Sequence, residues 1–80
     1  LRAAHRAIDR AREHGMSVLL GCMLETSIGI GAAAHLAPLA DHVDLDGHLL
    51  LADDPFRGLG LHDGRLVLPD RPGVGVEVAW

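Results

Sequence analysis

Two short apolar runs, each preceded by a helical pattern, constrain the fold of this chain more than any other feature. Residues 16–23 are almost continuously apolar, which is typical of a parallel strand covered on both faces. Residues 42–46 alternate with a period of two, which predicts a second strand. Because a helix precedes each strand, the order predicts an α/β fold class in which the two strands are parallel neighbours.

The two helical patterns differ in character. Residues 1–14 place apolar side chains at helical spacing opposite a face of arginines, and Gly15 ends this helix. Residues 28–37 are mostly small and follow the capping side chains of residues 25–27. Two glycines inside the second helix cost roughly 1 kcal/mol each relative to alanine, so we expect tertiary packing to hold it.

From residue 49 onward the pattern changes to short apolar stretches and turns. The dipeptide Asp63-Gly64 between two such stretches predicts a hairpin. Prolines and glycines then indicate irregular coil, with alternating valines at positions 74, 76 and 78 as a candidate edge strand. We therefore expect the chain to divide into residues 1–48 and residues 49–80.

Composition excludes several classes of partner. Seven arginines and no lysine against eleven acidic residues give a formal charge of −4, and four of the arginines lie within residues 1–14. The chain therefore lacks the basic stripe that DNA or RNA binding requires. No apolar stretch approaches the ~20 residues of a membrane span.

Length and cysteine content set the context of the chain. An apolar fraction of 49% excludes a disordered chain, and 80 residues leave room for one small domain. A single cysteine and no signal-peptide pattern predict a reduced, cytoplasmic setting. The first residue is Leu rather than Met. So apolar a chain of ~80 residues without a disulfide usually needs further stabilisation, such as a metal or a partner. We therefore expect it to be part of a longer protein.

Asp44 and Asp46 are the most informative polar residues. Side chains two positions apart on a strand point the same way with α-carbons about 6.5 Å apart, so both carboxylates can reach one cation. A bound ammonium or metal ion would relieve their mutual repulsion. An alkylammonium group presents three donors and suits acceptors in this arrangement. The structural alternative is an acidic turn at the end of a strand.

The same two aspartates also admit a calcium loop. They fall at the third and fifth positions of a loop that begins at His42, with Gly47 at the sixth position and Asp53 at the twelfth. The match is poor, because a histidine replaces the first carboxylate and Asp rather than Glu closes the loop. Pro55 also opposes the helix that should follow.

Other residues near the strand ends leave alternatives open. Glu25 either caps the next helix or faces a site at the carboxyl end of the first strand. Cys22 has no activating base beside it in sequence, so packing is favoured over nucleophilic catalysis. We expect His35 to be a core or interface histidine, and the three histidines after residue 40 lack the i, i+4 spacing of a helical zinc site.

Several segments together carry a resemblance. They are residues 21–30, 32–37, 44–47, 50–51 and 54–56, with a similar tail at 64–69 and 72–76. Together these segments resemble the C-terminal part of enolase-superfamily enzymes, and most closely the dipeptide epimerases of the L-Ala-D/L-Glu epimerase type. The likeness runs from about residue 1 through residue 76, and the Asp-x-Asp pair is its most discriminating element.

The resemblance implies a fold, an activity and a site. Residues 16–23 and 42–46 would be the seventh and eighth strands of a modified TIM barrel, and residues 49–80 would return through the hairpin toward a capping domain. The implied activity is Mg²⁺-dependent epimerisation of dipeptides, in which lysines remove and return an α-proton through an enediolate. The residues that the resemblance assigns to substrate are Asp44 and Asp46 for the dipeptide ammonium, and Cys22, Met23, Leu24 and Glu25 along the pocket.

The chain lacks two groups of residues that the family uses for catalysis. The chain has no lysine, and the family's three metal-binding carboxylates belong to earlier barrel strands. We therefore expect no catalytic residue and no metal ligand within these residues, and no activity from them alone. The implied partners are a dipeptide, the rest of the barrel and the capping domain, with a homo-oligomer left open. Two alternatives are a sibling enzyme, muconate cycloisomerase-like or N-acylamino-acid racemase-like, and a non-enzymatic cation-binding module.

Overall fold

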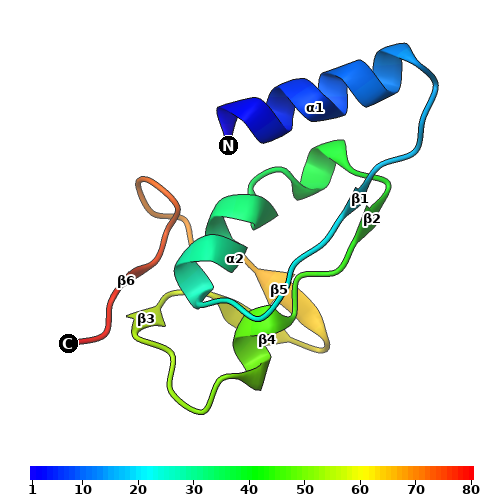
Figure 1. Cartoon of the computed structure of the whole chain (residues 1–80). Coiled ribbons are helices and arrows are strands. Elements are labelled where there is room, and N and C mark those ends of the chain that lie inside the picture. Colours follow the sequence, from blue (N-terminus) through cyan, green and yellow to red (C-terminus); the bar gives the residue numbers. More distant parts are fainter.

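A computed structural model describes all residues, 1–80, as a succession of short helices and strands (Figure 1). The elements in chain order are α1 (Arg2–Glu13), β1 (Leu19–Leu20), α2 (Ser27–Ala34), a 3₁₀ turn (Ala37–Leu39), β2 (His42–Val43), a second 3₁₀ turn (Gly47–Leu50), β3 (Phe56–Arg57), β4 (Gly60–His62), β5 (Arg65–Val67) and β6 (Glu77–Val78). None of the helices has the length and apolar character that a membrane crossing needs.

β1 and β2 are parallel neighbours, as the sequence pattern predicts. Leu19 lies opposite His42 and Leu20 opposite Val43. The paired strands are shorter than the predicted runs 16–23 and 42–46. After one further hydrogen bond, in which the N–H of Asp44 donates to the carbonyl of Leu20 at 2.8 Å, both segments continue as irregular backbone.

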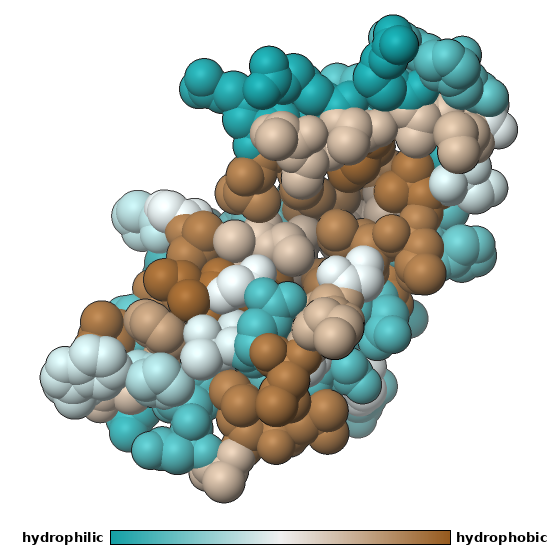
Figure 2. Space-filling view, viewed as in Figure 1, coloured by the Kyte–Doolittle hydropathy of each residue, from teal (hydrophilic) through white to brown (hydrophobic).

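α1 confirms the predicted amphipathic helix and is tied to the strand pair at its C-terminal end. Arg12 donates to the carboxylate of Asp41 at 2.6 Å and to the carbonyl of Leu39 at 2.8 Å. The same carboxylate accepts the N–H of Val18 at 2.7 Å. This N–H and the Arg12 guanidinium lower the pKa of Asp41. The outer side of α1 is hydrophilic, and its apolar side faces the rest of the chain (Figure 2).

α2 carries the centre of the small core. Ile30 is fully buried and packs with Ala34 and Leu45. A Cβ added at Gly31 would lie 3.4 Å from a methyl group of Val76, so the missing side chain allows the second half of the chain to approach the helix. Tertiary packing holds this helix, as expected. The helix ends at Ala34 rather than at residue 37, because the backbone tightens into a 3₁₀ turn that contains a proline.

The second half of the chain contains two antiparallel pairs. β4 and β5 form the predicted hairpin, and both turn residues, Asp63 and Gly64, have positive φ (49° and 75°), as a type I′ turn requires. β3 pairs with β6, and Phe56 lies opposite Val78. The edge strand predicted from alternating valines begins only at Glu77, because Gly75 has φ +82°, outside the strand region.

Candidate functional site

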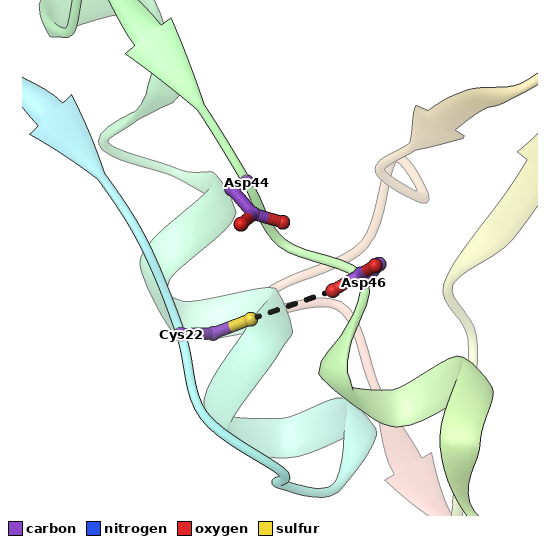
Figure 3. A group of neighbouring side chains, drawn as sticks. All are labelled: Cys22, Asp44 and Asp46. Carbon is purple, nitrogen blue, oxygen red and sulfur yellow. Dashed lines mark hydrogen bonds between the residues drawn. The ribbon is translucent and has the colours of Figure 1, made fainter.

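Three polar side chains converge where β1 and β2 end. Cys22 follows β1, and Asp44 and Asp46 follow β2, so the parallel pairing brings them to one edge of the strand pair (Figure 3). One ligand atom from each residue lies within 4.8 Å of the other two. The Cys22 thiol is 4.0 Å from Oδ1 of Asp46, within the range of a weak S–H···O hydrogen bond. The arrangement offers two carboxylates to one shared space.

A close backbone contact sets the spacing of this cluster. An ideal Cβ at the buried Gly47 would overlap the carbonyl oxygen of Met23 and would lie 3.3 Å from the sulfur of Cys22. Only glycine therefore lets the segment after β2 lie this close to the segment after β1. From the sequence, Gly47 entered as a position in a calcium loop and as part of the resembling segment 44–47, without a role in the spacing. The sequence feature that could have indicated this close contact is the glycine that directly follows Asp46.

Asp54 caps α2 from a distance and was not assigned a role from sequence. Its carboxylate accepts the backbone N–H of Ser27 at 3.1 Å, the Ser27 hydroxyl, and the N–H of Phe56 at 3.1 Å. Burial acts to raise the pKa of Asp54, but these hydrogen bonds outweigh it and the pKa is lowered. The expected local cap does not form, since no side-chain hydrogen bond comes from the N-cap residue Thr26.

The other sequence-predicted pocket residues lie outside the cluster. Met23 and Leu24 are 84% and 62% exposed on the surface of this chain. Glu25 is half-buried, and its carboxylate lies against Gly29 in the first turn of α2. The structure therefore brings together only three of the six predicted residues, Cys22 and the two aspartates.

A cavity of about 270 Å³ borders the same two aspartates. Its wall includes the apolar side chains of Leu49 and Leu61 together with His48, whose Nδ1 is buried without a hydrogen-bond partner. No histidine joins the cluster of Cys22, Asp44 and Asp46. His35 is exposed on this chain, so the expectation of a core histidine is wrong here; it directly follows α2, and its Nδ1 lies 2.6 Å from the carbonyl oxygen of Gly31, one turn back.

The donor set of the cluster does not suit a hard divalent cation. Mg²⁺ and Ca²⁺ take oxygen ligands, whereas a thiol favours softer metals. Residues Gly47–Leu50 form a 3₁₀ turn, and Asp53 is not part of the cluster, so the calcium loop that the spacing admits does not form. An ammonium group is the better match to the two carboxylates.

The whole chain matches one known protein family. The profile described as "Enolase C-terminal domain-like" matches residues 1–80. The chain belongs to this family. The resemblance to the enolase superfamily is thereby confirmed, and the mixed helices and strands are those of part of an enolase-family C-terminal domain.

Curated relatives carry epimerase names. An L-Ala-D/L-Glu epimerase of Bacteroides thetaiotaomicron is 43% identical over 76 residues, which are 95% of this chain and 20% of that protein. A hydrophobic dipeptide epimerase of a Flavobacteria bacterium is 46% identical over 72 residues, 90% of this chain and 21% of that protein. The chain thus spans about a fifth of the length of the curated relatives it matches.

A solved structure agrees with these relatives. The crystal structure of a dipeptide epimerase from Methylococcus capsulatus, complexed with Mg and the dipeptide L-Arg-D-Lys, superposes with a TM-score of 0.84 at 42% identity. The match covers 91% of this chain and 22% of the epimerase. Over the matched part, the backbone of this chain is therefore similar to the corresponding part of that epimerase.

Proposed function

We propose that this chain forms the C-terminal part of the substrate site of a dipeptide epimerase, in which Asp44 and Asp46 bind the terminal ammonium of the dipeptide. The observation that carries the proposal is the convergence of two carboxylates at the carboxyl edge of a parallel strand pair. In barrel enzymes that edge is where substrates bind. The epimerase names of the relatives support the same reading.

The chemistry of the cluster fits an ammonium group. Two carboxylates this close repel one another, and a cation between them stabilises both. An alkylammonium group can donate one hydrogen bond to each carboxylate and keep a third donor for another acceptor. Cys22 would line the pocket beside them, and Met23, Leu24 and Glu25 would extend its wall toward α2.

The rest of the barrel would complete the fold. In this proposal β1 and β2 are the seventh and eighth barrel strands, residues 1–48 are barrel elements, and residues 49–80 return toward a capping domain. Leu19 is 67% exposed, and an apolar groove between α1 and β1 is lined by Ile8 and Val18 among others. These surfaces are the ones that neighbouring barrel elements would cover.

The reaction would invert an amino-acid α-carbon by removal and return of its proton through an enediolate. The groups that move the proton would lie outside these residues, because the chain contains no lysine. The solved relative contains Mg, but the donor set of Cys22, Asp44 and Asp46 does not suit that ion. We therefore assign the cluster to orienting the dipeptide rather than to holding a metal ion.

The test is charge removal in the full-length enzyme. Asp44→Asn and Asp46→Asn should each lower kcat/KM for a dipeptide about ten- to a hundredfold, the effect of losing a charge-assisted hydrogen bond. Asp53→Asn is the matched control, because that carboxylate is exposed, lies close in sequence and is outside the cluster. Unchanged turnover in both cluster variants would contradict the proposal and favour a sibling enzyme of the superfamily.

A further inference from the structure

The segment between β1 and α2 carries most of the proposed pocket residues but has no regular structure of its own. Residues 21–26 are neither helix nor strand. Backbone of this kind is positioned by contacts from elsewhere, because it has no ladder or helical hydrogen bonds to hold it. Its position decides where Cys22 stands relative to the two aspartates.

Besides the weak hydrogen bond from Cys22 to Asp46, two contacts hold this segment, and both come from residues that follow the aspartate pair. Gly47 lies against the carbonyl of Met23, within the segment. Asp54 binds Ser27, at the end of the segment, through both the backbone N–H and the side-chain hydroxyl. The segment is thus fixed against the loop after β2 at two points.

The Asp54 contact differs from an ordinary helix cap. A local cap from Thr26 would satisfy an N–H one or two residues further on, at Ile28 or Gly29, without fixing the helix to any other part of the chain. Asp54 is 27 residues away and also accepts the N–H of Phe56, so the carboxylate joins the start of α2 to the start of β3. Thr26 makes no cap bond, so Asp54 is the side chain that binds the start of α2.

We propose that Asp54 is a positioning residue of the substrate site, which holds residues 22–26 against the loop that carries Asp44 and Asp46 by binding Ser27. This inference rests on the proposed function for its kinetic consequence, but the placement of Cys22 can be measured without any substrate. Asp54 does not touch the dipeptide in this scheme and acts only through the segment that ends at Ser27.

The experiment compares Asp54→Asn and Ser27→Ala with wild type in the full-length enzyme. The first readout is the rate at which iodoacetamide alkylates Cys22, followed by mass spectrometry of its peptide. The second readout is KM and kcat for a dipeptide. We expect Asp54→Asn to raise the alkylation rate about five- to tenfold, the effect of losing one helix cap on local opening. KM should rise severalfold while kcat changes less.

Four variants make the result specific. Ser27→Ala should shift both readouts in the same direction by less, and the double variant should be no worse than Asp54→Asn alone, because both changes break one interaction. Ser27→Thr keeps the hydroxyl, so it should shift the alkylation rate of Cys22 less than Ser27→Ala does. Asp41→Asn breaks a comparable carboxylate contact near the amino ends of the strands. It should lower the melting temperature but leave both readouts unchanged.

The outcomes separate the two proposals. The positioning role is wrong if Asp54→Asn leaves Cys22 alkylation unchanged, or if Asp41→Asn accelerates it equally at the same loss of melting temperature. If Asp54→Asn exposes Cys22 but wild type turns over no dipeptide, the positioning role stands and the proposed function fails. If wild type turns over a dipeptide and Asp54→Asn changes neither readout, the positioning role alone fails.

Discussion

Replacing Gly47 by Ala places a methyl group where the backbones after β1 and β2 touch. The new Cβ would overlap the carbonyl oxygen of Met23 and would lie 3.2 Å from its carbonyl carbon and 3.3 Å from the sulfur of Cys22. The first two atoms belong to the backbone, so a rotamer change cannot relieve the overlap. The two segments must separate instead.

The size of the effect follows from ordinary contact distances. Carbon–oxygen contacts are relaxed at about 3.3 Å or more, so the segments must move apart by about 1 Å. Overpacking of this kind costs roughly 1–3 kcal/mol. Alanine gains back up to about 1 kcal/mol through its lower backbone entropy. The steric cost is the larger of the two, and we expect Gly47→Ala to destabilise the protein.

Gly21→Ala is the matched control, because a Cβ at Gly21 meets no atom within 4 Å. It should be neutral or slightly stabilising in urea unfolding, whereas Gly47→Ala should lower the urea midpoint. The same separation would widen the 4.8 Å cluster of Cys22, Asp44 and Asp46, so KM for a dipeptide should rise only in Gly47→Ala. Equal stability and equal KM in the two variants would refute the close-contact argument.

Two further predictions concern stability. Ile30→Ala should cost about 2–5 kcal/mol because Ile30 is fully buried, while Ile28→Ala, at a site 43% exposed, should cost far less; similar urea midpoints would contradict the assigned core. The lowered pKa values of Asp41 and Asp54 mean that the unfolded chain takes up protons first, so their stabilisation is present above about pH 4 and is lost as pH falls through the lowered values. Urea midpoints should therefore fall less between pH 6 and pH 3 in Asp41→Asn and Asp54→Asn than in wild type, and parallel curves would contradict this.

The sequence predicted those elements that depend on local patterns. The helix over residues 1–14 has a clear apolar face, and Asp63-Gly64 has the chemistry of a type I′ turn, so both were recognised without knowledge of the rest of the fold. The ends of elements were less predictable. β1 ends after Leu20 and α2 after Ala34, and each end depends on where a distant segment stops pairing or where the backbone tightens.

The residues missed in the site act over long sequence separations. Asp54 meets Ser27 across 27 residues, and Gly47 meets Met23 across the gap between β1 and β2. No local spacing indicates such a pair, because the register of the parallel strands has to be known first. With Leu20 opposite Val43, both strands end at the same edge, and Cys22 and the two aspartates follow within three residues of that last pair. That register explains why a cysteine with no base beside it in sequence joins the cluster.

Asp44 and Asp46 face one shared space, but the structural reason differs from the one on which the prediction was based. The prediction used strand alternation, but β2 ends at Val43 and both aspartates lie on irregular backbone. Between them Leu45 is buried against Ile30 and Ala34 of α2. Asp46 is not extended, with φ −104° and ψ 2°, so burial of Leu45 between the two exposed aspartates, and not strand alternation, fixes this stretch of backbone. The hydrophobic core therefore positions the backbone of the pair that we propose binds the ammonium group, without a ladder of strand hydrogen bonds.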